Sequence, residues 1–333
     1  EGIVRARPED FTVVEDVGFS PTGSGEHDWL TIRKTNLNTM QVVEWLAKTA
    51  NVARSAIGFA GLKDREAITT QSFSVWRPGG QPLDYISKCP TGVEILEQTK
   101  HGKKLKRGTH KTNTFYLVVR GIDHQCKADL EQRLTQLRTL GVPNYFGAQR
   151  FGRDAQNMPQ VIELFSGKSK PVKKPLKSLL LSAARSWLFN EVVSAQISVD
   201  KETWFAQDQW LNLQGSASVF VGQPLSDDRF KALDIHPTAP LWGRARDKFM
   251  AGAPQQVQWE EDILSPYVEL RSGLERFGLE YQRRAARAKV QELEWSFGSD
   301  EQASEKLALS LNFTLHRGQF ATSVLRELIR GVQ

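Results

Sequence analysis

The stretches Phe11-Thr12-Val13-Val14-Glu15 and Asp28-Trp29-Leu30-Thr31-Ile32-Arg33 decide how the fold of this chain is interpreted. In both stretches β-branched and aromatic residues alternate with polar ones, a pattern typical of strands with one buried face. The segment 20–25 between them is rich in Gly, Ser and Pro, which indicates a loop. We therefore expect the chain to open with a pair of antiparallel strands.

The residues that follow predict a helix and two more strands. Asn38-Thr39 is a helix-capping pair, and the apolar residues after it recur with a period near 3.6. Strands are expected over 57–60 and 71–76 because apolar and β-branched residues dominate there. Asp64 then lies on the loop between two strands.

Strand and helix signals alternate less regularly in the rest of the chain. We expect strands over 114–119 and 307–315, helices over 126–140, 179–193, 260–290 and 321–329, a loop over 143–152 and a linker over 166–177. Strands first, helices in the middle and a final strand and helix predict an α+β fold. The middle is expected to be inserted into a domain built from both ends.

Length and composition indicate a globular protein with a polyanionic partner. The 333 residues are 40% hydrophobic and 25% charged, which fits two folded domains and excludes a histone-like or disordered basic tail. With 44 Lys and Arg against 38 Asp and Glu, the formal net charge is +6. A basic chain of this kind favours a polyanionic partner.

Several chemistries lack their motifs. Two cysteines, Cys89 and Cys126, cannot build a disulfide framework or a four-cysteine zinc site. The sequence has no glycine-rich dinucleotide or phosphate loop, no zincin motif and no metal-ligand spacing among its six His. It also has no apolar run of membrane-spanning length, and residues 1–10 are too charged for a secretory signal. We expect a cytosolic protein; what precedes Glu1 stays open.

Two clusters of positive charge are candidate phosphate contacts. Segment 100–111 contains six Lys and Arg, two His and no acid, and we interpret it as a basic hairpin arm. The second cluster closes the expected helix 260–290 and consists of Arg283, Arg284, Arg287 and Lys289. A solvated hairpin is the alternative for the arm.

Aromatic residues near these cations are candidates for stacking on nucleotides. Phe115 and Tyr116 follow the basic segment, and Tyr145, Phe146 and Phe151 lie in the glycine-rich loop 143–152. Because Phe115 begins an apolar strand, the alternative is that its ring belongs to the core.

Asp64 is the candidate for catalysis. It lies between Lys63 and Arg65, and neighbouring cations favour an ionised carboxylate that serves as a nucleophile or base. A solvated aspartate in a short charged loop is the alternative.

An ordered series of motifs resembles one known family, tRNA pseudouridine synthase D (TruD). The motifs are Arg7-Pro8-Glu9-Asp10-Phe11-Thr12-Val13-Val14-Glu15, Gly25-Glu26-His27, Phe59-Ala60-Gly61-Leu62-Lys63-Asp64, Asn113-Thr114-Phe115, Val142-Pro143-Asn144-Tyr145-Phe146-Gly147-Ala148-Gln149-Arg150-Phe151-Gly152, Leu181-Ser182-Ala183-Ala184-Arg185-Ser186 and Phe320-Ala321-Thr322-Ser323-Val324-Leu325-Arg326-Glu327-Leu328. The resemblance spans nearly the whole chain and is weakest over 199–300.

The resemblance implies a fold and a domain organisation. It predicts a mixed, mainly antiparallel pseudouridine-synthase sheet with helices, plus an inserted α/β domain. The catalytic domain would comprise 1–153 and 299–333, and the inserted domain 154–298.

It also implies an activity and a set of site residues. Family members isomerise uridine 13 of certain tRNAs to pseudouridine without a cofactor, so the expected partner is tRNA. The family also implies a monomer. Asp64 would be the essential aspartate, Phe115 the aromatic that packs on the target uracil, and Asn113 its neighbour in the pocket. Further substrate-binding residues are expected at Arg5, Arg7, Lys63, Gln71, Lys103, Lys104 and Arg150.

One cation is expected beside Asp64. Arg5 is preferred over Arg7, and Lys63 is expected to point away because adjacent side chains on extended backbone diverge. Two other functions stay open from the residues alone: an RNA-binding protein without catalysis, which needs no Asp64, and a tRNA methyltransferase, which needs a glycine-rich cofactor loop.

Overall fold

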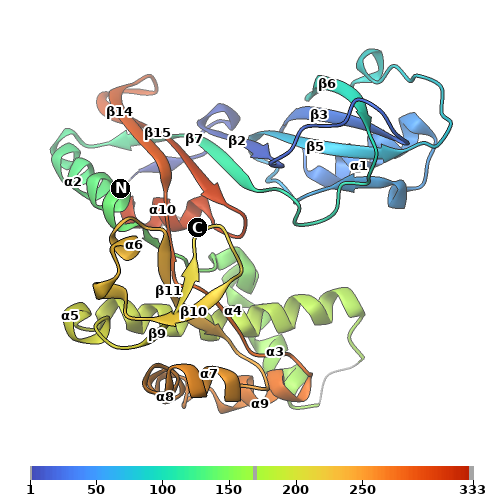
Figure 1. Ribbon diagram of the computed structural model, residues 1–333. Coiled ribbons are helices and arrows are strands. Elements are labelled where there is room, and N and C mark those ends of the chain that lie inside the picture. Colours follow the sequence, from blue (N-terminus) through green and yellow to red (C-terminus); the bar gives the residue numbers. More distant parts are fainter. Residues whose placement is uncertain (1, 168–170, 330–333) are drawn as a thin grey trace. The chain divides into compact units, whose positions relative to one another are not determined.

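The computed structural model describes residues 2–167 and 171–329, and the chain divides into two compact units (Figure 1). Unit 1 consists of Glu1–Glu131 and Gln291–Gly318, and unit 2 of Gln132–Val290 and Gln319–Gln333. These divisions fall at other residues than the domain boundaries expected at 153 and 299. The assignment of a catalytic and an inserted domain stays a prediction.

Unit 1 is organised around a nine-stranded sheet in the order β14-β15-β7-β2-β5-β3-β6, with β1 beside β7 and β4 beside β5. The strands are β1 (Ile3–Val4), β2 (Phe11–Asp16), β3 (His27–Thr35), β4 (Ile57–Phe59), β5 (Ile68–Trp76), β6 (Val93–His101), β7 (Thr112–Ile122), β14 (Gln291–Asp300) and β15 (Ala303–His316). The pair β2–β5 is parallel, and the other described pairs are antiparallel. The α+β prediction with a mainly antiparallel sheet is confirmed.

The expected opening pair is wrong in its pairing, although both strands form. Strand β5 lies between β2 and β3, parallel to the first and antiparallel to the second. Alternation of residues shows which face of a strand is buried, but it does not show which strand is its neighbour. The parallel pairing is made through a long crossover that contains β3, helix α1 (Thr39–Ala50) and β4.

The basic segment 100–111 is not a hairpin arm. Its flanking strands do not pair with each other, since β6 pairs with β3 whereas β7 pairs with β1, β2 and β15. The segment is instead a loop between β6 and β7, and Leu105 at its middle is buried in a small cluster with Trp29 and Ala60.

Helix α1 covers one face of this sheet. Asn38 caps the helix by accepting a hydrogen bond from the Gln41 main-chain N–H, and the Gln41 side chain accepts one from Asn38 N–H in return. The apolar side of α1 packs on strand residues that include Leu30, Ile32 and Phe73. The predicted capping pair and helical period are therefore both confirmed.

The face that α1 covers continues into an area with polar residues. Residues opposite each other in register share a face, and this face carries Lys34, Thr69, Gln71, Val13, Glu15, Asn113 and Phe115. The two areas meet at the start of α1, where Thr39 Oγ1 donates to Gln71 Oε1 at 2.9 Å. The loop that contains Asp64 is bonded to residues of this face.

Unit 2 is mostly helical and contains two small sheets. The helices are α2 (Lys127–Leu140), which begins in unit 1, α3 (Asn157–Phe165), α4 (Lys174–Ser198), α5 (Lys201–Trp204), α6 (Asp228–Lys231), α7 (Asp247–Gly252), α8 (Pro254–Ile263), α9 (Val268–Arg276) and α10 (Ala321–Leu328). One sheet has the order β10-β9-β11-β12, from β9 (Gln209–Leu213), β10 (Val219–Gly222), β11 (Ile235–Leu241) and β12 (Gln282–Ala285). The other pairs β8 (Val142–Pro143) with β13 (Arg287–Ala288).

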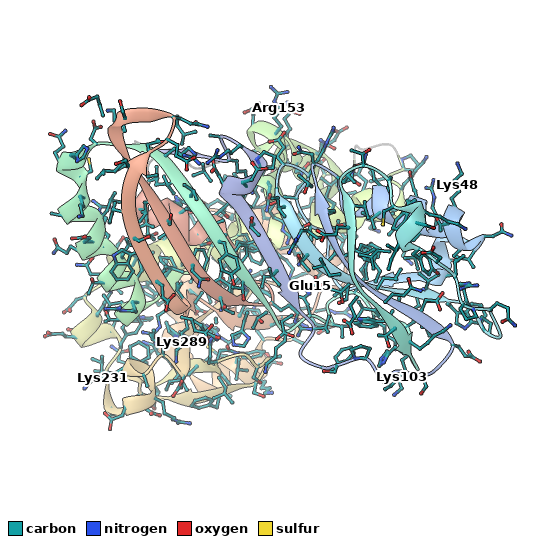
Figure 2. All side chains as sticks on the ribbon, turned by 90° about the horizontal axis from the view of Figure 1, so that it is seen from above. Glu15, Lys48, Lys103, Arg153, Lys231 and Lys289 are labelled. Carbon is teal, nitrogen blue, oxygen red and sulfur yellow. The ribbon has the colours of Figure 1, made fainter. Side chains whose placement is uncertain are left out.

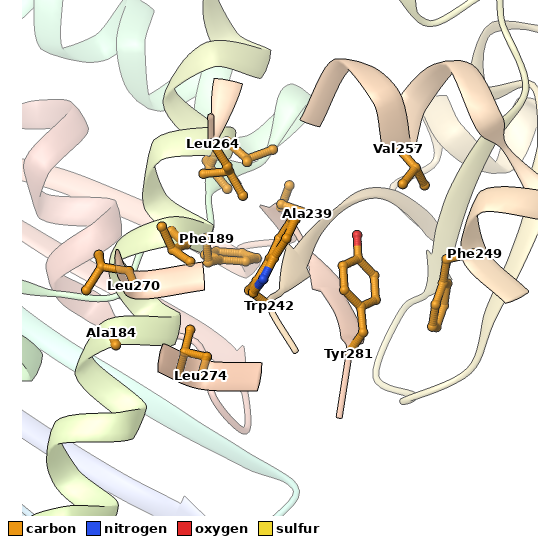
Figure 3. Packing of buried hydrophobic residues seen from close by; sticks show 14 of the residues in the cluster. Ala184, Phe189, Ala239, Trp242, Phe249, Val257, Leu264, Leu270, Leu274 and Tyr281 are labelled. Atoms are coloured by element: carbon orange, nitrogen blue, oxygen red, sulfur yellow. The ribbon is translucent and has the colours of Figure 1, made fainter. Parts of the chain in front are cut away.

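The core of unit 2 gathers aromatic rings from separate elements (Figure 3). Trp242 and Tyr281 pack edge to face at 5.9 Å between ring centres, and Phe249 lies 5.1 Å from Tyr281. The helix predicted over 179–193 is confirmed within α4. In the described ranges, no helix is both long enough and apolar enough to cross a membrane.

The helix predicted over 260–290 is wrong. Helix α8 ends at Ile263, α9 runs only to Arg276, and β12 and β13 follow. Pro266 cannot donate the hydrogen bond that a continuous helix needs there, and Gly278 has a φ of +75° that ends α9. The arginines near residue 285 are therefore on strands.

Candidate active site

Asp64 lies on the loop between β4 and β5, as predicted, with 49% of its side chain exposed. Three side chains bind the main chain of this loop. Gln71 Nε2 donates to Gly61 O at 3.2 Å, Thr39 Oγ1 accepts from Lys63 N at 2.9 Å, and Lys34 Nζ donates to Asp64 O at 2.7 Å. The loop is thus open to solvent at the carboxylate and anchored at its backbone.

Arg5 provides the cation beside Asp64, as expected. Its Nη2 donates to Asp64 Oδ2 at 2.9 Å, and its guanidinium lies 4.0 Å from the ring centre of Phe11. Arg5 has a φ of +63°, a left-handed conformation that is uncommon for a residue with a side chain. Asp64 Oδ1 has no partner among the described residues, so one carboxylate oxygen is left for another molecule.

Arg7 does not take part in this ion pair. Its guanidinium lies 2.6 Å from Glu301 Oε2 and 3.4 Å from Asp10 Oδ1. Asp10 in turn belongs to a buried ion network with Arg120 and Asp300. In this structure Arg7 therefore joins the start of the chain to the returning strands.

Lys63 points away from Asp64, as predicted, and enters a buried polar network. Its Nζ lies 2.7 Å from Glu15 Oε2 and donates to Asn113 Oδ1 at 2.5 Å. Burial raises the pKa of Glu15, and the nearby Lys63 ammonium opposes this rise. Asn113 is buried and, through Lys63, is linked to the loop of Asp64.

His110 borders the same network from the basic segment. It lies beside Gly61, and burial together with the Lys63 and Arg317 charges lowers its pKa to about 4. A neutral imidazole at physiological pH follows, with a buried Nδ1 that has no hydrogen-bond partner among the residues the structure describes.

Phe115 lies on the face described above and is 8% exposed. Its ring stacks on Phe313 at 5.3 Å with an interplanar angle of 23°, and it meets Phe11 edge to face at 6.4 Å. The ring is therefore fixed by core neighbours, and Arg5 lies over one of them. A stacking role toward a substrate stays a prediction.

Gln71 is fully buried, and both ends of its amide are occupied by Thr39 and Gly61. Such a side chain holds the loop and is not exposed to a substrate. Sequence reasoning did not find Lys34, which is also fully buried. A signal was present, because Lys34 follows Leu30 and Ile32 at the spacing of the inward face of a strand.

The basic segment contains two kinds of cation. Lys104 Nζ donates to Ser55 O, Lys100 pairs with Asp28 at 2.5 Å, and Arg107 lies 3.5 Å from the ring centre of Phe59. Lys103 and Lys106 are exposed, and Figure 2 shows Lys103 at the outer edge of unit 1. The segment as a whole is thus not a uniform phosphate-binding arm.

The side chains from Arg283 to Lys289 are bonded within unit 2. The fully buried Arg283 is therefore not a phosphate contact, whereas such a contact by the half-buried Arg284, Arg287 and Lys289 stays a prediction. Arg283 forms a fully buried ion pair with Glu260, and Arg284 donates to Asn144 and lies 3.8 Å from the ring centre of Phe146. Arg287 donates to two main-chain oxygens, those of Phe230 and Ile235. Lys289 pairs with Asp234 at 3.3 Å.

The aromatic loop 143–152 and Arg150 belong to unit 2. Phe151 is buried against Trp187, and Phe146 is half-buried and packs on Phe189, so both rings are held by neighbouring rings of unit 2. A stacking role toward a nucleotide stays a prediction. Arg150 lies over Phe146 at 5.4 Å and donates to Ser182 Oγ at 3.2 Å. Burial lowers its pKa. Its role toward a substrate stays a prediction.

The part of the chain that the structure describes contains no group of three or more His, Cys, Asp or Glu that could hold a metal ion. At Asp64 the structure presents a carboxylate with one free oxygen, an arginine partner and a polar network beside it. Such a group can act as a nucleophile or as a base.

Comparison with known proteins places this chain among the pseudouridine synthases, which are isomerases, so the chain is an enzyme of that class. The family model of tRNA pseudouridine synthase D (TruD) matches residues 1–165 and 163–328. The chain belongs to this family, and the resemblance seen in its motifs is confirmed.

Relatives match over nearly their full length. The tRNA pseudouridine synthase D of Methylococcus capsulatus is 41% identical over 98% of this chain and 91% of the relative. That of Nitrosococcus oceani is 40% identical over 98% of this chain and 90% of the relative. A crystal structure assigned as TruD from Methanosarcina mazei has a TM-score of 0.70 at 19% identity, covering 99% of this chain and 93% of that chain, which shows the shared fold.

Proposed function

We propose that this chain converts uridine 13 of tRNA to pseudouridine with Asp64 as the catalytic carboxylate. The observation that carries the proposal is the set of contacts made by the carboxylate of Asp64 and by the backbone of its loop. One of its oxygens is paired with Arg5, the other is free, and the backbone beneath is anchored at three points. A surface aspartate without a function does not need this support.

The reaction needs no redox partner and no source of energy. The N1–C1′ bond of uridine breaks, the uracil turns, and a C5–C1′ bond forms. C5 loses its proton, and N1 ends with one. The free oxygen of Asp64 supports three routes: attack on C1′, addition to C6 of the ring, or removal of the C2′ proton. In each route Arg5 supplies the positive charge that balances the carboxylate.

The target uridine must leave its stack before Asp64 can reach it, at a cost of a few kcal/mol. Stacking of the uracil near Phe115 would return about 1–3 kcal/mol of this cost. Phe115 is held by Phe313, so the ring needs no ordering when the base arrives. Asn113 and Lys63 border the same face and are proposed to shape the pocket.

The remaining proposals concern the setting of the reaction. We propose that the enzyme acts as a monomer in the cytosol on tRNA and without a cofactor. Residues 1–153 and 299–333 would form its catalytic domain, with 154–298 inserted.

The test is incubation of an unmodified tRNA transcript with the purified chain. Pseudouridine is detected by primer-extension stops after carbodiimide treatment, and we expect one new stop at position 13. A transcript with cytidine at position 13 should give none there. A stop elsewhere would contradict the uridine 13 assignment, and no stop would favour a binding protein without catalysis.

Asp64→Asn tests the catalytic role. The amide is nearly isosteric but is neither a nucleophile nor a base, so turnover should fall roughly a thousandfold or more while tRNA affinity stays near wild type. Glu66→Gln is the matched control, because Glu66 is an exposed acid on the same loop. Substantial turnover by Asp64→Asn, checked for deamidation, would overturn the assignment.

A further inference from the structure

Lys34 is a lysine at a position where an apolar residue is expected. It lies on β3 opposite Thr69 of β5 and Val93 of β6, and its side chain is fully buried. Its Nζ donates to two main-chain oxygens, that of Leu37 at 2.5 Å and that of Asp64 at 2.7 Å. No ion pair joins Lys34 to a carboxylate in the described part of the chain.

A buried ammonium without an ion-pair partner is costly, because two carbonyl dipoles replace only part of its hydration. A methionine would fill a similar volume without that cost. The charged groups that face Lys34 are Asp64 and Lys63, both from the loop, whereas Thr69 and Val93 on the flanking strands carry no charge. Burial lowers the pKa of Lys34 to about 8.

Lys34 is one of three side chains that bind the main chain of the Asp64 loop, and it differs from the other two in the group it holds. Gln71 and Thr39 hold Gly61 and Lys63 by neutral hydrogen bonds, whereas Lys34 holds the carbonyl of Asp64 itself. Hydrogen bonds with a charged donor are stronger than neutral ones. Lys34 is thus the anchor closest to the reacting carboxylate.

We propose that Lys34 is a positioning residue for the isomerisation, fixing the main chain of Asp64 so that its free oxygen stays aimed at the substrate. The inference rests on the proposed role of Asp64. It assigns Lys34 no contact with tRNA, so its effect should be on the rate of the bound complex and not on tRNA affinity.

The experiment measures the single-turnover rate on tRNA at saturating enzyme, the tRNA Kd, and both from pH 6 to 10. Lys34→Met should lower the rate about 100-fold at pH 7, since a displacement near 1 Å can cost that much, and should leave Kd within about twofold. Lys34→Arg should retain at least about tenfold more activity than Lys34→Met, because a guanidinium still donates to carbonyls.

The pH profile gives a readout that a merely structural lysine would not change. In the wild type the rate should fall several-fold above about pH 8, where the ammonium becomes an amine and the bond to Asp64 O loses its charge. Ionisation of the substrate is common to all variants, so the profile of Lys34→Met should lack only the step near pH 8. An identical step in both profiles would overturn the inference.

Val75→Ala is the stability control, since Val75 is a buried core residue of β5 in the cluster under α1. The inference would be overturned if the single-turnover rate of Lys34→Met fell no further than that of Val75→Ala. It would also be overturned if the tRNA affinity of Lys34→Met fell by the same factor as its rate. If Lys34→Met does not fold, the wild-type step near pH 8 and its absence in Lys34→Arg carry the test.

The two proposals fail differently. If Asp64→Asn remains active, the proposed function fails, and Lys34 has no reacting group to position. If Asp64→Asn is inactive while Lys34→Met turns over normally, only the inference about Lys34 fails.

Discussion

Two arginine–carboxylate pairs, one in each unit, use their hydrogen-bonding groups in opposite ways. Arg283 and Glu260 in unit 2 are both fully buried, and Arg283 also bonds Thr238 and Tyr281. Arg5 and Asp64 in unit 1 make one bond at 2.9 Å and leave one carboxylate oxygen free. Arg5 Nε is buried without a partner among the described atoms.

The difference indicates what each pair is for. A buried pair with all its groups satisfied stabilises one arrangement of strands and helices and offers nothing to a ligand. A partly exposed pair with unused groups adds little to stability but can act on another molecule. Charge in the sequence does not distinguish the two cases, whereas the completeness of the hydrogen bonding does.

The largest effect is expected from breaking the pair in unit 2. Arg283→Met leaves the Glu260 carboxylate buried and unpaired, which should lower the free energy of unfolding by about 3–5 kcal/mol. The measurement is urea unfolding of the full chain. The double variant Arg283→Met with Glu260→Leu should recover much of the loss, and an equal loss in both would contradict the explanation.

Breaking the pair in unit 1 should affect activity instead. Arg5→Met removes the charge that balances Asp64, and we expect a fall in single-turnover rate of about 100-fold, with stability changed by no more than about 1 kcal/mol. Arg5→Lys should restore part of the rate. Arg7→Met is the control for a nearby arginine that pairs elsewhere. A large loss of stability with an unchanged rate would make Arg5–Asp64 a second structural pair.

Lys34 allows a test in which stability and activity move in opposite directions with pH. Its pKa is about 8 in the folded chain and about 10.5 when unfolded, so between these values the unfolded state binds more protons. Folding stability from this group therefore rises from pH 8 to 10.5, by on the order of 1–3 kcal/mol. Between pH 8 and 10.5 the free energy of unfolding of the wild type should rise by that amount relative to Lys34→Met, as measured by urea unfolding at each pH. A constant difference would contradict the lowered pKa.

Local features of the structure could be predicted from the sequence, and long-range ones could not. The buried face of β2, the cap of α1, the loop position of Asp64 and the Arg5 pair all follow from neighbouring residues and from the family motifs. The insertion of β5 between β2 and β3 depends on a pairing partner that residue alternation does not specify.

The errors about charge have a related cause. Arg283, Arg284 and Arg287 form a basic cluster in the sequence, but their partners Glu260, Asn144 and Phe230 are distant in the chain. Whether an arginine is free depends on those contacts. Lys34 was missed for the opposite reason, since a single lysine in a strand is ordinarily interpreted as an exposed residue.

The smallest expected effect separates satisfied from free cations within the basic segment. Lys103 and Lys106 are exposed, whereas Lys104 donates to Ser55 O. If the exposed pair contacts phosphates, the double variant Lys103→Ala with Lys106→Ala should flatten the log–log salt dependence of tRNA affinity by about 2, at roughly 0.9 per contact on duplex. Lys104→Ala is the matched control and should leave the slope unchanged, because the Lys104 ammonium is already held by the protein.

Fluorescence titration of labelled tRNA across a range of salt concentrations measures both slopes. An equal decrease of the slope for Lys104→Ala would show that a bond to a protein carbonyl does not prevent a lysine from binding tRNA. Complete hydrogen bonding would then separate structural from ligand-binding arginines but not structural from ligand-binding lysines.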